Sequence, residues 1–314
     1  MSSSFAYTPP SSDEIKAIQN VEGSIRLLLA QRRLYSKAKW YHSARMIGMA
    51  VIGIGAPIVS VLSPDLAVLA GAVAGLWIFL GRTWFLGRER LLTEQAAAVQ
   101  ERFDFRVFAM PELAPRKIAP SLEDIVLETA NVTDLAQVAN EQHLLDWYPV
   151  QPEDPGAVSV AISQRANAAY TDRLLRMTVN VWTTLAIIWA IALILLSIEM
   201  GLSLRDFLLG IFLPVLPGAL DIMDFMRNIP VSARERAELA ATIQRRLEEH
   251  RKPLEPAELL VWQDRLFELR RTAPLVPDTL YWLWRKTNET GMHAAAKALR
   301  ESHRPAPSGR EGDT

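Results

Sequence analysis

The sequence contains no cysteine. That absence excludes disulfides, thiolate catalysis and thiolate metal sites. The formal net charge is only −1, so no overall basic field predicts binding to a DNA or RNA polymer. The histidines are scattered, and no two of them have the spacing of a metal-binding motif. We therefore expect neither a metal site nor a nucleic-acid polymer as partner.

Motifs of catalysis and cofactor binding are absent as well. The chain contains no G-x-S-x-G elbow, no Walker loop and no G-x-G-x-x-G fingerprint. Gly53 and Gly55 lack the third glycine of that fingerprint and lie inside an apolar run. The sequence therefore predicts no enzymatic activity and no cofactor.

Long apolar runs are the main feature that is present. Hydrophobic residues make up 50% of the chain, but they concentrate in two blocks, at about 46–87 and 177–226. A helix that crosses a bilayer needs about 20 mostly apolar residues. The last run is the weakest, because Asp221 and Asp224 close it, and a buried core helix is the alternative for each run. We predict an all-α membrane protein with four transmembrane helices, at Met46–Pro64, Leu66–Gly81 with an extension past Arg82 to Leu86, Met177–Ile198 and Phe207–Met226.

Short linkers arrange these helices as two hairpins. Residues 63–65 join the first pair and residues 199–206 join the second, so both termini and the middle segment lie on one side. Lys and Arg residues gather on that side of every run, whereas the opposite loops contain only Arg205. By the positive-inside rule, that side is cytoplasmic and the protein lies in the inner membrane. Residues 1–12 are polar, which argues against a cleavable signal peptide.

The same pattern divides the chain into regions. We expect a cytoplasmic helix at 1–45, hairpin 1 at 46–87, a cytoplasmic middle region at 88–176, hairpin 2 at 177–226, a cytoplasmic helical region at 227–302 and a disordered tail at 303–314. In the N-terminal part we expect one helix over 13–45 with Ser12 as its N-cap. In the middle region we expect an extended stretch or a loop at 103–108, and helices at 121–130, at 132–145 and from 157 into the third span. In the C-terminal part we expect a helix opened by a Ser232–Glu235 capping box, and further helices at 257–271 and from about 277.

Three groups in the predicted spans are candidates for helix packing or a pore. Gly71 and Gly75 form a small-xxx-small pair, which suits close helix contact within one subunit or between subunits. Asp221 and Asp224 share a helix face and suit either a cation-conducting pore mouth or the plain cytoplasmic boundary of the span. The third group could line a lumen or bond to a neighbouring helix, and consists of Asn180, Thr183 and Thr184.

One group in the cytoplasmic parts is a candidate ligand site. Arginines beside aromatic residues can hold an anionic, base-bearing ligand by pairing with phosphate and stacking on the base. The same residue types also suit an ordinary charged face and core aromatics. The candidates are Arg165, Asn167, Arg173, Trp147 and Tyr148.

Four stretches carry a resemblance to a known family. They read LLLAQRRLYSKAK at 27–39, VQERFDFRV at 99–107, DWYP at 146–149 and SQRANAAYTDRLLR at 163–176. Together with the two-hairpin order, the chain resembles the SMODS-associated four-transmembrane effector family over nearly its whole length. It departs from the family at Met110-Pro111, where a tryptophan is usual.

The resemblance implies a membrane effector of bacterial anti-phage defence. It implies a cyclic oligonucleotide as activator, a homo-oligomer in the lipid bilayer that forms pores or disrupts the membrane, and cell death or growth arrest as the outcome. Two other hypotheses stay open. One is a membrane scaffold that recruits a cytoplasmic partner through the aromatic stretch 281–284, and the other, the weakest, is a small transporter.

Overall fold

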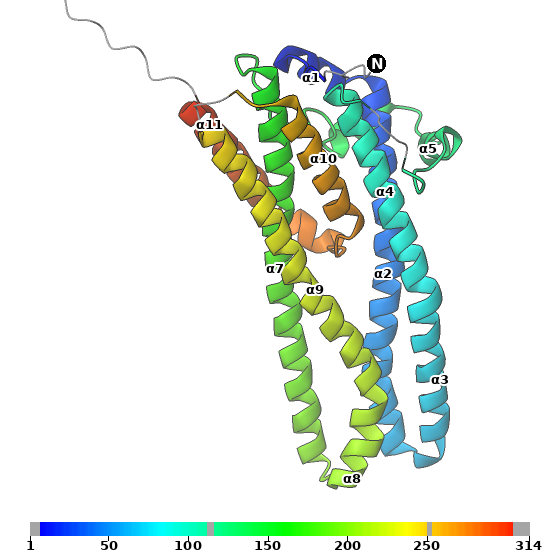
Figure 1. The fold of residues 1–314 in the computed structure, drawn as a ribbon. Coiled ribbons are helices and arrows are strands. Elements are labelled where there is room, and N and C mark those ends of the chain that lie inside the picture. Colours follow the sequence, from blue (N-terminus) through cyan, green and yellow to red (C-terminus); the bar gives the residue numbers. More distant parts are fainter. Residues whose placement is uncertain (1–6, 112–115, 250–252, 304–314) are drawn as a thin grey trace, which may run out of the picture.

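The computed structural model describes residues 7–111, 116–249 and 253–303. It shows a bundle of long helices with shorter helices gathered at one end, and no strand occurs in the described ranges (Figure 1). The elements follow in the order α1 (Ser12–Gln19), α2 (Glu22–Leu62), η1 (Pro64–Leu66), α3 (Ala67–Leu80), η2 (Gly81–Phe85), α4 (Leu86–Val107), α5 (Leu122–Thr129), α6 (Leu135–Glu141), α7 (Gly156–Glu199), α8 (Leu204–Phe207), η3 (Leu208–Phe212), α9 (Leu213–Glu248), α10 (Pro256–Arg271) and α11 (Asp278–His303).

The long helices run without interruption from the end with the short helices into the apolar runs. α7 has 44 residues, which corresponds to about 66 Å at the α-helical rise. α2 likewise continues through the boundary at Met46, and α3, η2 and α4 follow one another without a break. The helices expected to run unbroken into the first and third apolar runs agree with this arrangement. η2 and η3 are π-helical turns, a form that widens the helix locally.

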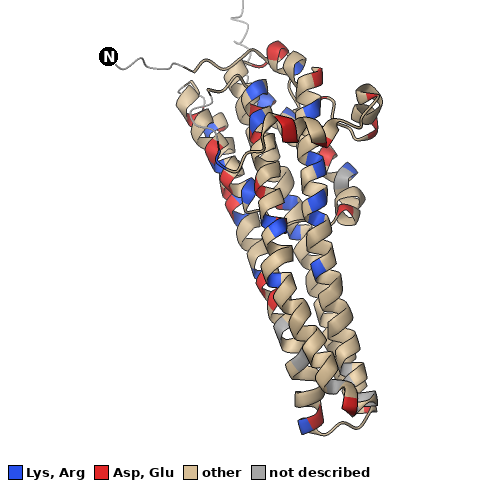
Figure 2. Cartoon of the chain, turned by 90° about the vertical axis from the view of Figure 1, so that its right-hand side faces the viewer, with Lys and Arg blue, Asp and Glu red and all other residues tan. Residues whose placement is uncertain are grey.

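Charged residues divide the bundle along its length. Figure 2 shows them gathered around the short helices and again at the far tip, with an uncharged stretch between. In the described part of the chain, two helical stretches are long and apolar enough to cross a membrane, Val68–Val107 and Gly156–Glu199, and none of the most apolar window of the second is buried. Apolar side chains point outward on all the long helices, for example Val51 at 63% exposed, Leu69 at 61%, Ile188 at 58% and Leu213 at 51%.

The charged end of the bundle has an ordinary hydrophobic core. Fully buried side chains from α1, α2, α4 and α9, with the start of α7, pack there into one cluster, which includes Ile15, Leu28, Phe103, Ile162 and Ile243. α10 and α11 add to this cluster. The long helices are therefore held together by water-excluding packing at this end, whereas their apolar halves lie largely uncovered.

The N-terminal prediction of one helix over 13–45 is wrong. The chain breaks at Val21, which has an extended backbone before α2 begins. The N-cap of α1 is Ser11, which forms a capping box with Glu14. Ser12 is buried instead, and its hydroxyl donates to the carbonyl of Asp154 at 2.6 Å. Ser12 therefore attaches α1 to the loop that precedes α7.

Two further predictions about helix boundaries are wrong. Residues 103–107 belong to α4 and are not extended, because Phe103 and Val107, one helical turn apart, are both fully buried in the core. Ser232 opens no helix, since it lies inside α9, where its hydroxyl accepts a hydrogen bond from Arg236.

The remaining expected helices are present with adjusted ends. The helix expected at 132–145 shortens to α6, which Asp134 caps. α5, α10 and α11 occupy their expected places. The expected tail lies outside the described residues except for its first position.

Candidate functional site: two buried charge clusters on the long helices

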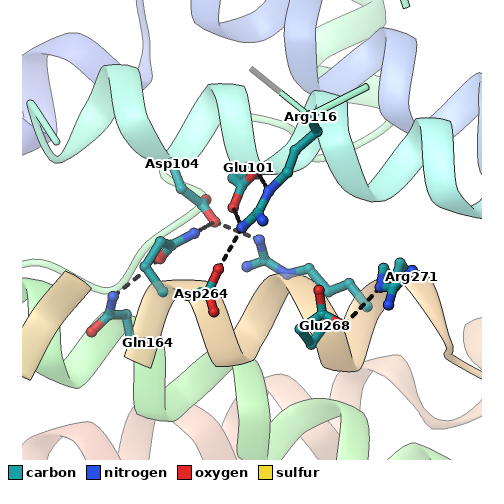
Figure 3. Close-up of polar contacts among 9 residues, drawn as sticks. Glu101, Asp104, Arg116, Gln164, Asp264, Glu268 and Arg271 are labelled. Atoms are coloured by element: carbon teal, nitrogen blue, oxygen red, sulfur yellow. Dashed lines mark hydrogen bonds and ion pairs between the residues drawn. The ribbon is translucent and has the colours of Figure 1, made fainter. Parts of the chain in front are cut away.

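A fully buried carboxylate, Asp104 on α4, is the centre of the first cluster, which we call the Asp104 cluster. Its Oδ2 accepts hydrogen bonds from Arg270 Nη1 at 2.5 Å and from Gln263 Nε2 at 2.7 Å, and its Oδ1 accepts one from the Tyr148 hydroxyl at 2.5 Å. Gln164 Nε2 continues the network by donating to Gln263 Oε1 at 3.0 Å (Figure 3). Every partner of the carboxylate is therefore a donor, as an ionised buried aspartate requires.

The electrostatics of the Asp104 cluster favour one protonation state. Burial alone would lower the pKa of the Arg270 guanidinium, but Asp104 and Tyr148 together hold that pKa above its usual value. Burial and then the Asp104 charge raise the pKa of the Tyr148 phenol well above its usual value. Arg270 therefore stays charged and Tyr148 stays neutral at any physiological pH, so the cluster does not suit a group that must exchange protons.

A second ion pair lies beside the cluster and faces solvent. Arg116 donates to both oxygens of Glu101, at 3.0 and 2.9 Å, and to Asp264 at 2.6 Å (Figure 3). Its guanidinium also lies 4.0 Å from the ring centroid of Phe267. This arrangement attaches the segment after α4 to α10 next to the Asp104–Arg270 pair.

Three of the four stretches that carry the family resemblance contribute residues to this cluster and to the ion pair beside it. Glu101 and Asp104 come from the stretch at 99–107, Tyr148 from DWYP, and Gln164 and Asn167 from the stretch at 163–176. Arg270 Nε lies 3.4 Å from Asn167 Oδ1, which connects α10 to α7. The cluster thus joins α4 and α7, which continue toward the second and third predicted spans.

The second cluster lies where the charged end gives way to the apolar runs, and we call it the boundary cluster. On one side, His42 Nδ1 lies 3.0 Å from Glu89 Oε1 and Arg45 Nη2 lies 3.2 Å from Glu89 Oε2. On the other side, Arg45 Nη1 lies 3.8 Å from Asp221 Oδ2, and Arg82 donates to Asp221 Oδ1 through Nε at 2.8 Å and also through Nη2. Arg45 therefore connects two carboxylates that belong to different hairpins.

Aromatic contacts add to this connection between the hairpins. The His42 ring on α2 lies 4.9 Å from the ring of Phe225 on α9, and Phe225 lies 6.0 Å from Trp182 on α7, between centroids. Arg45 and Asp221 are 7% and 8% exposed, so their attraction is screened less than that of a surface pair. Sequence reasoning missed this group, because His42 and Arg45 lie on α2 and Glu89 lies on α4, with no motif to connect them.

The structure separates the predicted ligand residues. Tyr148 and Asn167 contact the Asp104 cluster, whereas Trp147 is half-buried against the hydrophobic core. Arg165 donates to Gln244 at 2.9 Å, and the Arg173 guanidinium lies beside Gly291 on α11. Tyr148 also lines a cavity of about 550 Å³ between α1, the loop before α7 and α11, and the other four do not line it.

The predicted span residues also differ in their surroundings. No described atom of another element lies within 4 Å of a Cβ built on Gly71 or Gly75, so neither glycine is packed against a described residue of another helix there. Asp221 is buried and ion-paired, whereas Asp224 is exposed. Thr183 and Asn180 are exposed, and the exposed Thr184 hydroxyl bonds to the carbonyl of Asn180.

Comparison with known protein families identifies the family of this chain. A family model for the SMODS-associating 4TM effector domain matches residues 13–299. The chain belongs to this family. Membership implies a membrane effector in nucleotide-signalling defence, and the matched range includes both charge clusters. No curated protein and no solved structure matches the chain. Within the described ranges, no group of His, Asp and Glu residues has the arrangement of a metal site.

Proposed function

We propose that this SMODS-associating 4TM effector spans the inner membrane four times with both termini in the cytoplasm. On activation by a nucleotide second messenger, it oligomerises and forms pores or disrupts the bilayer, which kills the cell or arrests its growth. It has no enzymatic role. The observation that supports this proposal is the uncovered apolar half of a bundle whose other half is well packed.

The two less apolar segments, on α2 and α9, lie alongside the two spans that pass the test of length and apolarity. α2 packs along α3 and α4, and α9 packs along α7. Both expose large apolar side chains at the level of the clear spans, including Ile47 and Ile54 on α2 and Met223 on α9. A monomeric soluble protein rarely exposes so continuous an apolar surface, whereas a helix in lipid satisfies its own backbone and can do so. Four spans therefore account for the surface better than two.

The cytoplasmic half has the connections that a sensor needs. The Asp104 cluster joins α4, α7 and α10 through charge-assisted hydrogen bonds, and the boundary cluster joins α2, η2, α4 and α9. A ligand changes the state of the spans only if it binds the open assembly better than the closed one. Because the helices are continuous, a rearrangement of the cytoplasmic half moves the membrane half with it.

Assembly between copies requires a helix face that is not already used. Gly71 and Gly75 present such a face on α3, since no described atom of this chain occupies it. Small residues let helix backbones approach closely in lipid, where hydrophobic attraction between helices is absent. This face is our proposed contact between subunits.

Leakage from liposomes tests the proposal. We expect purified protein in dye-loaded vesicles to release dye when an activating cyclic oligonucleotide from a panel is added. Substitution of Gly71→Leu should abolish release, whereas Gly87→Leu should retain it, because Gly87 lies just past the end of the second span at Leu86 and on an open face. Intact vesicles, together with an intact membrane potential in cells that carry the activated system, would refute pore formation.

A membrane scaffold is the second candidate. On α11, Trp282 is 50% exposed and Leu283 is 70% exposed, which offers an apolar contact for a cytoplasmic partner. In that case an unrelated four-helix anchor could replace residues 46–87 and 177–226 without loss of defence. Loss of defence after this exchange would exclude the scaffold and favour the pore.

A further inference from the structure

A cavity of about 610 Å³ opens between α2, α4 and α5. Figure 1 shows α5 beside the upper part of α4, away from the rest of the short helices. Four of the lining side chains are charged and two are aromatic, namely Lys37, Arg88, Asp124, Glu128, Trp40 and Tyr41. The cavity belongs to neither charge cluster, and the proposed function assigns it no role.

The lower rim of the cavity lies at the depth of the lipid headgroups, if the spans are those proposed above. Tyr41 packs edge-on against Trp84 with centroids 5.6 Å apart, and Trp40 and Trp84 are 60% and 53% exposed. Trp40 precedes Met46, where the apolar run begins, by about 9 Å at the helical rise. Exposed tryptophan and tyrosine rings at this depth are typical of a membrane interface.

Charges of opposite sign occupy different heights in the cavity. Arg88 lies on α4 next to Glu89, which contacts His42 and Arg45, so it belongs to the lower rim. Arg88 has no ion-pair partner among the described residues. Glu128 accepts from Lys37 at 2.5 Å, and Lys37 lies one turn farther from the membrane than Tyr41. The cavity therefore has Arg88 near the hydrocarbon and, farther out, two carboxylates, of which Glu128 is paired with Lys37.

Each carboxylate has an oxygen available to a ligand. Lys37 bonds to Glu128 Oε1, and Ser121 bonds to Asp124 Oδ2. In the described part of the chain, Glu128 Oε2 and Asp124 Oδ1 have no hydrogen-bond donor. With two basic and two acidic side chains, the lining is neutral overall but divided by charge. Such a lining fits a zwitterion with its anionic end toward the bilayer.

We propose that this cavity binds the headgroup of phosphatidylethanolamine from the cytoplasmic leaflet. The phosphate lies against Arg88, and the ammonium donates hydrogen bonds to Glu128 and Asp124. The acyl chains leave past Trp40 toward the hydrocarbon. A phosphatidylglycerol headgroup brings no cation to the carboxylates, and a choline headgroup has no N–H to donate. The site therefore selects ethanolamine over both.

Binding of short-chain lipids to the full-length protein in detergent tests the site. We expect dioctanoyl phosphatidylethanolamine to bind more tightly than the choline and glycerol analogues, as counted by native mass spectrometry. Arg88→Gln should weaken ethanolamine-lipid binding about tenfold, the loss typical of one charge-assisted hydrogen bond. The matched control, Arg90→Gln, changes an exposed arginine of the same helix that does not line the cavity.

A second pair of variants tests the selectivity. Glu128→Gln should bring the affinities for the ethanolamine and choline lipids together, and Glu123→Gln on the same helix should leave them apart. Equal binding of the three lipids, tighter binding of the glycerol lipid, or equal effects of Arg88→Gln and Arg90→Gln would overturn the proposal. The inference depends on the proposed four-span placement but not on pore formation. Failure of vesicle leakage with intact lipid selectivity therefore counts only against the pore.

Discussion

The indole ring of Trp77 covers the backbone of Gly48 so closely that a side chain at Gly48 has no room. A Cβ built there would lie 2.1 Å from ring carbons Cε2 and Cζ2. Gly48 lies near the membrane entry of α2 and Trp77 near the end of α3, so this contact joins the two helices of hairpin 1. The ring then meets Phe85 in η2, with centroids 5.4 Å apart.

Gly48→Ala should therefore separate α2 from α3. The added methyl group must displace the Trp77 ring, and overpacking of this kind costs about 1–3 kcal/mol. Thermal unfolding in detergent would measure the effect as a lowered Tm. Gly55→Ala is the matched control on the same helix, because no described atom lies within 4 Å of its Cβ. Equal Tm values for the two variants would show that the ring moves aside freely.

Asp104→Asn should be among the most damaging single changes in the charged end of the bundle. It keeps the size of the side chain but leaves the buried Arg270 without a counter-charge, which costs about 3–5 kcal/mol. Denaturant titration in detergent would measure the loss of unfolding free energy.

Two comparisons support the Asp104 measurement. The double variant Asp104→Asn with Arg270→Gln should be more stable than Asp104→Asn alone, since it removes both charges. Asp264→Asn, at an ion pair whose carboxylate is 64% exposed, should cost about 1 kcal/mol or less. A double variant no better than the single one would contradict the assignment of a compensating ion pair.

Asp221→Asn should loosen the contact between the hairpins. The change leaves Arg82 without its carboxylate partner and Arg45 with Glu89 alone, and the cost should be about 1–3 kcal/mol because Arg82 is partly exposed. A cysteine pair introduced across α2 and α9 in this naturally cysteine-free chain would report the loosening as slower crosslinking. Asp224→Asn, one turn farther on the same helix and exposed, should crosslink at the original rate, and slowing by both variants alike would refute a specific role for Asp221.

Single cysteines test the proposed topology. Asp65→Cys and Glu199→Cys lie at the exposed tips of the two hairpins, and Glu123→Cys lies on α5. An impermeant maleimide applied to intact spheroplasts should label the first two, because positive residues keep the other side in the cytoplasm. Glu123→Cys should react only after lysis. Labelling of Glu123→Cys in intact spheroplasts would show that the protein has the opposite orientation.

Helix existence could be predicted from the sequence, because uncharged runs of bilayer length and capping residues are local signals. The helix expected at 121–130 is α5, which Ser121 and Asp124 cap. Predictions failed where tertiary contacts decide. In the sequence, residues 103–108 alternate between apolar and polar as a strand does. In the structure, Phe103 and Val107 lie one helical turn apart and both are buried in the core. Pro230 stands inside α9 without ending it, so the apparent capping box after it had no helix start to cap.

The candidate site was less accessible to sequence reasoning. Asp104 and Arg270 are 166 positions apart, and no local motif connects them. Asp221 did stand out, but its partner Arg82 reads as a residue that extends to the headgroups from the second span. Only the packing of the hairpins against each other shows that these two side chains neutralise one another.

The placement of the two π-helical turns has a mechanical consequence. In the four-span arrangement proposed above, each hairpin would pair an uninterrupted helix, α2 or α7, with an arm that contains a π-helical turn, η2 near the cytoplasmic leaflet and η3 near the opposite leaflet. A displacement of the charged end would then pass to the far leaflet along α2 and α7, while the two arms would bend at different depths. The hairpins would then shear past one another instead of tilting together, which widens the bundle at both leaflets.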